Sequence, residues 1–329
     1  SIQSGSIDCD LILDLRKNLP LFTQHEFRDG YLKPESGNQI ALFKALLKVT
    51  NLIGEFEKPR YINYEPNLCA HARNEISGCN LCIDHCPVAA ITSDGEKVKF
   101  DPFICGGCGS CSNVCPTGAA KYDVPAGESL TMRIRTLINH YLKKEGTNPI
   151  ILFHDTNWGE KILSILAREI DGLPTNILPL AVNSLPQIGL ESILSASVYG
   201  AEHIVYLCSP LKQDDKAIIE KQGTYAKAIF DGLGYGADRL SIVDDNDPEI
   251  ISEFLWNIDP KPGMPNSDFM PKGRKRSIMS LALNSLHKHA PEPVDMIELP
   301  IGAPFGTVEL NSEDCTLCLS CVGACPTGA

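Results

Sequence analysis

The sequence predicts two fold classes in one chain: an α+β domain organised by cysteines, and an α/β domain with a parallel sheet and helices on both faces. The first prediction rests on residues 61–127, where two cysteine runs and many glycines occur with little helical periodicity. The second rests on residues 128–258, where short apolar runs alternate with helical patterns. Strands that alternate with helices in this way form parallel sheets.

The strands and helices of residues 128–258 can be placed one by one. The apolar runs expected to be strands are PIILFH, ILPLAV, HIVYLC and RLSIV. The helical patterns that separate and follow them lie at 158–171, 187–199, 214–233 and 248–256. Residues 232–236, GLGYG, follow a helix and precede a strand, the reverse of the order in a nucleotide-binding loop. We therefore expect these glycines to end a helix.

The remaining segments complete the expected organisation. Residues 7–15 are predicted to form a strand and residues 39–53 a helix. Residues 259–276 are rich in Pro, Gly and charge, so we expect an exposed connection in which the basic triplet 274–276 is a solvated turn. A last helix is predicted at 277–289. The five expected units are an N-terminal segment (1–60), the cysteine-rich domain (61–127), the α/β domain (128–258), a linker with a helix (259–306) and the start of a second, truncated cysteine-rich module (307–329).

Composition and charge exclude several classes of protein. The 329 residues suffice for roughly two domains of about 150 residues each. A formal net charge of −12 argues against a nucleic-acid-binding protein, which normally carries a basic face. It suits a protein that meets a positively charged partner, because complementary charge speeds encounter. No apolar run approaches the roughly 20 residues of a membrane span, and no signal-peptide pattern is present, so the expected location is cytoplasmic.

Fourteen cysteines are the strongest compositional signal, and twelve of them lie in three short runs. In a reducing compartment, clustered cysteines are more often metal ligands than disulfides. The two outside the runs are Cys9 and Cys208, each in an apolar stretch. Both are expected to be buried strand cysteines.

The second run has the spacing C-x2-C-x2-C-x3-C-P, which bacterial iron–sulfur proteins use. Three closely spaced thiolates can bind three irons of one [4Fe–4S] cubane, while the fourth is directed to a neighbouring cluster. The first run follows the same scheme with seven extra residues between its first two cysteines. The expected ligands of cluster I are Cys69, Cys79, Cys82 and Cys115, and those of cluster II are Cys86, Cys105, Cys108 and Cys111. Glycines between the ligands of the second run suit a backbone that approaches a cubane closely.

A zinc site and histidine ligands are the alternatives to these ligand sets. Structural zinc sites usually pair two C-x2-C knuckles across a spacer, whereas here a third cysteine follows each knuckle and a Cys-Pro closes each run. Iron–sulfur clusters are therefore favoured over zinc. His71 and His85 lie near the cysteines, but four cysteines are available without them, so a surface or supporting role is expected.

The third run repeats the spacing but has no companion run. Its cysteines are Cys315, Cys318, Cys321 and Cys325. We expect this part to be a fragment of a longer protein that holds further clusters, so the present chain should contain two clusters and about eight irons. In all three runs, a short helix that begins at the proline is expected.

The cysteine runs carry a resemblance to known proteins. Residues 61–125 resemble an α+β ferredoxin-like two-cluster domain of bacterial ferredoxins. More widely, the segments GEFEKPRYINYEPNLCAHARNEISGC and FDPFICGGCGSCSNVCPTGAA resemble a family of larger, formate-dehydrogenase-associated 4Fe–4S binding proteins. This resemblance implies electron transfer, with a formate dehydrogenase as a redox partner.

Residues 148–245 are similar to the delta subunit of methyl-viologen-reducing hydrogenase, which uses cysteines near an Asn-Trp element to bind a cluster. Here that element reads HDTNWG, with His154 and no cysteine. We therefore expect an α/β scaffold without metal or tightly bound flavin.

Two functions remain. The favoured one is a non-catalytic electron carrier or oxidoreductase subunit with no catalytic residues of its own. The alternative is a reductase whose α/β domain binds a flavin or small substrate at the carboxyl ends of its strands and is fed by the clusters. No phosphate-binding loop follows a strand, which favours the carrier.

Overall fold

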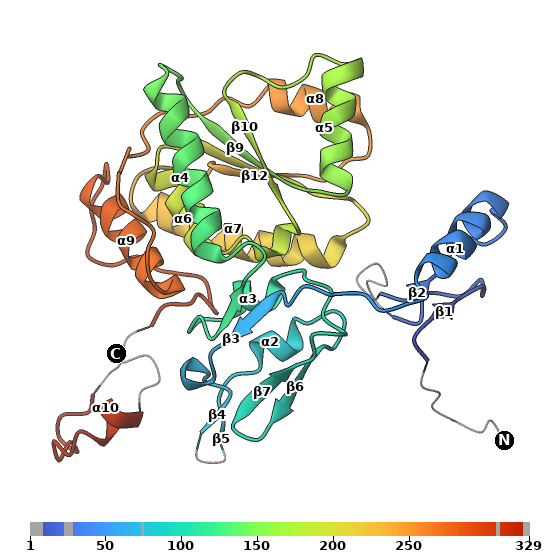
Figure 1. Cartoon of the computed structure of the whole chain (residues 1–329). Helices are drawn as coiled ribbons and strands as arrows, with labels where there is room; N and C mark the ends of the chain where they lie inside the picture. Colours follow the sequence, from blue (N-terminus) through green and yellow to red (C-terminus); the bar gives the residue numbers. More distant parts are fainter. Residues whose placement is uncertain (1–8, 23–28, 74–75, 307–309, 325–329) are drawn as a thin grey trace.

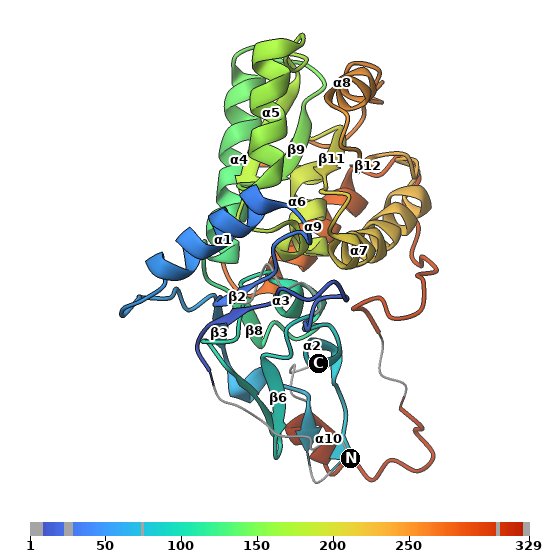
Figure 2. The same cartoon turned by 90° about the vertical axis from the view of Figure 1, so that its right-hand side faces the viewer.

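The computed structural model describes residues 9–22, 29–73, 76–306 and 310–324. Figure 1 shows an α/β body, a smaller cysteine-rich domain beside it, and helix α1 standing apart from both. Figure 2, a view turned by 90°, shows the same two bodies stacked end to end. Within the described ranges, no helix combines the length and apolarity that crossing a bilayer requires.

The N-terminal part contains a parallel strand pair and one helix. Strand β1 (Ile12–Leu13) pairs with β2 (Tyr31–Leu32), and α1 spans Gln39–Asn51. The strand predicted at residues 7–15 is therefore reduced to two residues, with residues 7 and 8 outside the described part. The predicted helix is present and begins where the Asn38 side chain accepts a hydrogen bond from the Ala41 amide, a normal N-cap.

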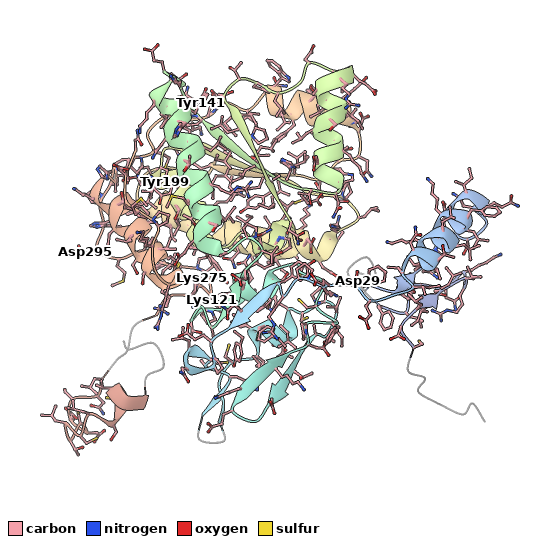
Figure 3. The ribbon with its side chains drawn as sticks, in the orientation of Figure 1. Asp29, Lys121, Tyr141, Tyr199, Lys275 and Asp295 are labelled. Carbon is pink, nitrogen blue, oxygen red and sulfur yellow. The ribbon has the colours of Figure 1, made fainter. Side chains whose placement is uncertain are left out.

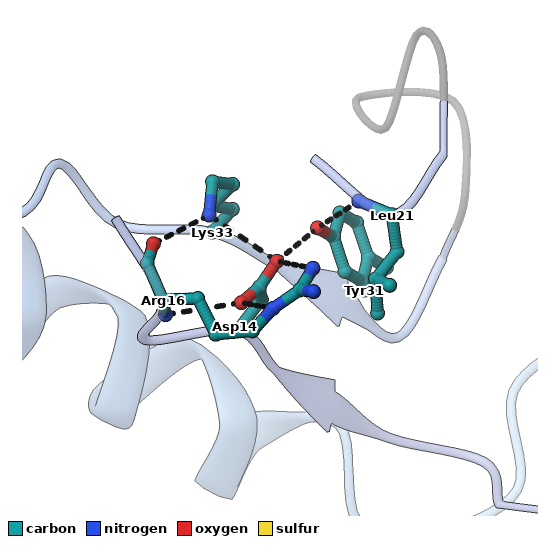
Figure 4. A network of polar contacts seen from close by, with 5 residues as sticks. All are labelled: Asp14, Arg16, Leu21, Tyr31 and Lys33. Atoms are coloured by element: carbon teal, nitrogen blue, oxygen red, sulfur yellow. Dashed lines mark hydrogen bonds and ion pairs between the residues drawn. The ribbon is translucent and has the colours of Figure 1, made fainter. Parts of the chain in front are cut away.

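A buried carboxylate holds these N-terminal strands together (Figure 4). Asp14 is 4% exposed and accepts hydrogen bonds from the Tyr31 hydroxyl at 2.7 Å and from the Arg16 guanidinium at 2.9 Å. The Lys33 ammonium adds a contact at 3.2 Å. Hydrogen bonds from Arg16 and Tyr31 hold the pKa of Asp14 well below its usual range. The charged carboxylate thus ties residues that lie up to 19 positions apart.

The cysteine-rich domain is built from short antiparallel pairs and two short helices. Its elements are β3 (Ile62–Tyr64), η2 (Pro66–Leu68), β4 (Ala72–Arg73), β5 (Ile76–Ser77), α2 (Leu81–Asp84), β6 (Ile91–Asp94), β7 (Lys97–Phe100), α3 (Ser110–Val114) and β8 (Ala120–Tyr122). β3 pairs with β8, β4 with β5, and β6 with β7. A small core of Ile62, Ile91, Val98 and Tyr122 packs directly against the cysteines.

The α/β body contains four parallel strands in the order β10-β9-β11-β12. The strands are β9 (Ile150–Asp155), β10 (Ile177–Val182), β11 (His203–Leu207) and β12 (Leu240–Val243). The four predicted strands and their parallel arrangement are confirmed. The strand that follows β9 in the chain, β10, lies on one side of β9, and the next strand, β11, lies on its other side. The direction in which successive strands are added therefore reverses between β9 and β11.

Both faces of the sheet are covered by helices, which explains why β9 is apolar without alternation. Ile150 and Leu152 pack in a cluster with α5 (Trp158–Glu169) and α8 (Pro248–Trp256). Ile151 and Phe153 point to the other face. That face is covered by α4 (Gly127–Lys143), α6 (Leu190–Val198), α7 (Gln213–Gly232) and α9 (Lys275–Lys288). A strand buried on both faces has no polar side to display.

Several predicted boundaries agree closely with the structure. Helix α8 covers 248–256 as predicted, since Pro248 takes its first position and the Asp247 carboxylate accepts the Glu249 amide at 2.9 Å. Helix α7 ends at Gly232, and Gly234 adopts a φ of +78° just after it. The glycines therefore end a helix, as predicted.

The prediction that residues 259–276 form an exposed connection is wrong in part. Met264 is 8% exposed and belongs to the core of the α/β body. The Ser267 amide donates to the Val198 carbonyl at the end of α6. This segment returns along α6 before α9 begins, and such long-range burial has no local signature in its Pro- and Gly-rich sequence.

Candidate iron–sulfur centres

Each of the three cysteine runs contains a short helix at the same place relative to its cysteines. In each run a short helix begins two residues after one cysteine and carries the next cysteine. The helices are α2 with Cys82, α3 with Cys111, and α10 (Ser320–Ala324) with Cys321. The prediction of a helix that begins at the proline is wrong for the first two runs. Their helices end before Pro87 and Pro116, because the residue before a proline is disfavoured in helical conformation.

The second and third runs follow the same path between ligands. Gly107 and Gly109 adopt φ values of +73° and +82°, and the corresponding Leu317 and Leu319 adopt +57° and +58°. Residues with a side chain rarely adopt such values, so the equivalence is specific. In both runs a cysteine sulfur lies 3.3 Å from a serine hydroxyl, as Cys108–Ser110 and Cys318–Ser320. The hydrogen bond with Ser320 lowers the pKa of Cys318 to about 7.

The first group of cysteines surrounds an apolar cavity. Its lining includes Val98, Phe100 and Ala120 together with four cysteines. These cysteines are Cys69, Cys79, Cys82 and Cys115. Burial raises the pKa of the Cys82 thiol to about 12, and the neighbouring thiols of Cys115, Cys69 and Cys79 add to the rise. Three cysteines of the first run and the last cysteine of the second run therefore lie around one space.

The second group is closer to the α/β body. Burial raises the pKa of the Cys111 thiol well above its ordinary value. The nearby thiols of Cys108, Cys105 and Cys86 raise it further, by smaller amounts. Burial raises the pKa of Cys108 to about 11, although the Ser110 hydrogen bond opposes the rise, and Cys86 again contributes. Cys86, the last cysteine of the first run, thus lies near the leading cysteines of the second.

The surroundings of both groups fit iron–sulfur ligands. The Ala90 amide donates to the Cys86 sulfur at 3.2 Å. Amides of Leu81 and Gly107 donate to other cysteine sulfurs and favour their thiolate form. Amides that point at sulfur also tune cluster potentials.

A single metal ion fits the same residues less well. Over the part of the chain that the structure covers, no three His, Cys, Asp or Glu side chains are grouped as ligands of one ion. A tetrahedral zinc site needs its ligands around one point. A cubane takes each thiolate on a different iron, so its ligands stand farther apart.

Both histidines near the cysteines are hydrogen-bonded within the protein. His71 is 4% exposed, with Nδ1 2.9 Å from the Cys79 carbonyl oxygen and Nε2 2.7 Å from the Ser93 hydroxyl. His85 Nδ1 lies 2.9 Å from the Leu81 carbonyl oxygen. His71 therefore supports the backbone of a candidate ligand.

The cysteines outside the groups differ from one another. Cys208 is 2% exposed directly after β11, and burial raises the pKa of its thiol to about 12. The prediction that Cys9 is buried in a strand is wrong, because Cys9 is exposed and β1 begins only at Ile12. In the third run Cys315 is half-buried and Cys318 and Cys321 are exposed, while Cys325 lies outside the described residues.

Sequence reasoning missed how the cysteine-rich domain joins the α/β body. The Asn113 side chain, in α3, donates to the carbonyls of Pro186 and Ile188 at 2.9 and 3.0 Å and is 4% exposed. The Asn183 side chain donates to the Tyr122 hydroxyl and to the carbonyl of Gly107. Both sets of contacts involve the segment after β10, which includes η3 (Leu185–Gln187). The second cysteine group therefore lies against the carboxyl end of β10.

A lysine from α9 completes this junction, and Figure 3 labels it as Lys275. The Lys275 ammonium donates to the carbonyls of Ser112 at 2.9 Å, Asn113 at 2.5 Å and Cys115 at 3.5 Å. Its side chain is 16% exposed. The prediction that residues 274–276 form a solvated turn is therefore wrong for Lys275, whose partners lie about 160 positions away.

The HDTNWG element starts a helix. The Asp155 carboxylate accepts the amides of Asn157, Trp158 and Gly159 at 2.9, 2.6 and 2.9 Å and is 3% exposed. These bonds satisfy amides that the first turn of α5 leaves unpaired.

Comparison with known proteins identifies two matching families. A family described as "4Fe-4S dicluster domain" matches residues 77–119, and one described as "4Fe-4S binding domain" matches residues 308–329. An uncharacterized ferredoxin of Methanocaldococcus jannaschii is 41% identical over 46 residues, which are 14% of this chain and 74% of that protein. A ferredoxin of Saccharopolyspora erythraea is 44% identical over 46 residues, 13% of this chain and 43% of that protein.

A second kind of relative is much longer. The indolepyruvate oxidoreductase subunit IorA of Pyrococcus horikoshii is 42% identical over 45 residues, 13% of this chain. The match spans only 7% of that subunit. Cysteine-rich sequence of this kind is therefore shared by small proteins and by a subunit of an oxidoreductase.

Proposed function

Because the chain belongs to the 4Fe–4S ferredoxin family, we propose that it is an electron carrier or oxidoreductase subunit whose first cysteine-rich domain holds two [4Fe–4S] clusters. The observation that supports this most directly is the reciprocal placement of Cys115 and Cys86, each beside the leading cysteines of the other run. This placement is the one expected when tandem runs exchange their fourth ligand.

The proposed ligand sets follow from that exchange. Cluster I is held by Cys69, Cys79, Cys82 and Cys115, and cluster II by Cys86, Cys105, Cys108 and Cys111. When bound, each cluster accepts and releases one electron. The chain's own residues hold the irons, donate amide hydrogen bonds to the sulfurs and exclude water through the surrounding core.

The proposed partner is a redox protein with a basic face. The net charge of −12 favours such a partner through electrostatic steering. The matches with oxidoreductase subunits support a role beside a larger enzyme. The resemblance noted in the sequence makes a formate dehydrogenase the first partner to try, with reduction of the clusters by formate as the readout.

We also propose a division into five units. They are an N-terminal segment (1–60), a two-cluster domain (61–127), an α/β domain (128–258), a linker with a helix (259–306) and a third-run module (307–329). The carrier is favoured over a reductase that uses the carboxyl edge of its sheet, because no phosphate-binding loop follows a strand. A further cluster would use cysteines of the third run.

The ligand sets are tested by double substitution in anaerobically purified protein. Cys82→Ala with Cys115→Ala should lose only one cluster, about four irons, because both residues serve cluster I. Cys111→Ala with Cys115→Ala should lose both clusters, about eight irons. Iron and sulfide analysis with EPR of the reduced protein gives the readout, relative to the parent chain.

The opposite pattern would contradict the exchange. If Cys111→Ala with Cys115→Ala removes one cluster while Cys82→Ala with Cys115→Ala removes two, each run binds its own cubane. A parent chain that binds zinc and no sulfide would contradict the proposed function altogether.

A further inference from the structure

Lys275 is the first residue of α9, and its ammonium lies at the carboxyl end of α3. The last carbonyls of a helix have no partner within the helix. Lys275 supplies that partner through Ser112, Asn113 and Cys115. A cation at this end of a helix is also electrostatically favourable.

The carbonyls that Lys275 binds belong to the segment that joins the two cysteine groups. Ser112 directly follows Cys111 of the second group, and Cys115 belongs to the first. The ammonium is therefore placed on the connection between both proposed clusters. The backbone at Gly118 packs closely against the Lys275 side chain, since a Cβ at position 118 would lie 3.3 Å from Lys275 Cβ.

Among the described residues, one carboxylate lies close to the Lys275 ammonium, near the distance limit of an ion pair. The Glu191 carboxylate, from α6, lies 3.6 Å away, and both side chains are 16% exposed. The Glu191 Oε2 atom is buried and accepts no hydrogen bond within the described residues. The neighbouring Arg274 is different, because its side chain is 60% exposed and lies 3.6 Å from Glu65.

A half-buried cation beside a redox group acts on its potential. Reduction adds one negative charge to a [4Fe–4S] cluster, so a nearby positive charge stabilises the reduced state more than the oxidised state. Inside a protein this interaction is much stronger than in water, and salt screens it little. Net charge near the cluster is one of the factors that set iron–sulfur potentials.

We propose that Lys275 is a positioning residue that raises the reduction potentials of both clusters, with Glu191 as the opposing charge. The proposal rests on the ligand sets given above. It makes α9, an element of the α/β body, part of the electrostatic environment of the redox centres.

The test is a potentiometric titration followed by EPR on the parent chain and on matched variants. Lys275→Gln keeps donors for the carbonyls but removes the charge, and we expect both midpoint potentials to fall. Lys275→Arg keeps the charge and should restore the parent values. Arg274→Gln removes an exposed charge from the adjacent position and should leave the potentials nearly unchanged. The shift in Lys275→Gln should persist at high salt.

A second variant keeps the proposal testable if Lys275→Gln loses its clusters. Glu191→Gln removes the opposing charge without touching a carbonyl of α3, and it should raise both potentials. Unchanged potentials in either variant, with iron and sulfide at the parent level, would overturn the proposal. Loss of [4Fe–4S] signals from the parent chain would instead contradict the proposed function.

Discussion

Two features of Gly109 disfavour any other residue at this position: its positive φ and the close approach of Gln187. Its φ of +82° belongs to the left-handed region, which costs other residues about 1–2 kcal/mol. A Cβ there would also lie 2.6 Å from the Cβ and 2.8 Å from the Cα of Gln187. Since Gln187 lies in η3 of the α/β body, this glycine sets how closely the two bodies can approach.

We predict that Gly109→Ala lowers the free energy of unfolding by about 2–5 kcal/mol, the sum of backbone strain and overpacking. The control is Gly236→Ala, where φ is +83° but a Cβ would meet nothing within 4 Å. That variant should lose only about 1–2 kcal/mol. Anaerobic urea unfolding followed by circular dichroism gives both values. Equal losses in the two variants would mean that contact with Gln187 has no energetic weight.

At the scale of elements, strand β11 contains a buried titratable side chain. His203 is 5% exposed, and its Nε2 lies 2.8 Å from the Ser241 hydroxyl of β12. Burial lowers the pKa of His203 to about 4, with Asp238 opposing and Arg239 and Lys227 adding smaller effects. The imidazole is therefore neutral in the folded chain at pH values where an unfolded one is charged.

This difference makes stability depend on pH. Below pH 6.5 the unfolded chain binds a proton at His203 that the folded chain binds only near pH 4. The free energy of unfolding should therefore fall as the pH decreases through this window. His203→Gln should remove about 2 kcal/mol of the decrease between pH 7 and pH 5. Denaturant unfolding at both pH values measures it, with His287→Gln, at an exposed position, as the matched control.

The elements themselves were largely predictable because their signals are local. Helix α8 was placed to the residue by Pro248 and Trp256, and β9 was found from one apolar run. The short helices of the cysteine runs were misplaced because four or five residues carry no periodicity. Met264 was missed because its burial depends on α6 and α9, which are distant in sequence.

For the whole molecule, the junction between the two bodies is polar and specific. Asn113 bridges two carbonyls after β10, and replacing it leaves both buried without a donor. Buried unpaired carbonyls cost about 1–3 kcal/mol each. The carboxyl edge of a parallel sheet usually receives a ligand. In this protein the carboxyl end of β10 contacts the cysteine-rich domain.

We predict that Asn113→Ala loosens this junction while each body stays folded. Amide hydrogen exchange across residues 183–189 should become faster, because the segment loses its contact with α3. Asn176→Ala is the matched control, since that side chain donates to the Asn148 carbonyl within the α/β body. Unchanged exchange at 183–189 in Asn113→Ala would show that other contacts suffice to hold the bodies together.

In the candidate site, as in the fold, the sequence predicted some features and not others. Cysteine spacing alone predicted the ligand sets proposed above, because ligand geometry constrains sequence over short distances. Lys275 could not be found, because it binds backbone carbonyls, which any residue offers. Gln187 and Asn183 were missed for the same reason: the docking of two bodies leaves no repeat or motif in either.

The docking of the cysteine-rich domain gives the two cysteine groups unequal access to the surroundings. All four cysteines of the first group are partly exposed, and so are Cys86, Cys105 and Cys108 of the second group. Cys111 and its neighbours Gly109, Ser110 and Asn113 are buried beneath the α/β body. With the proposed ligand sets, both cubanes would have a side open to the surroundings, and the iron held by Cys111 would lie behind the α/β body. Dioxygen diffusing from outside would reach that iron last.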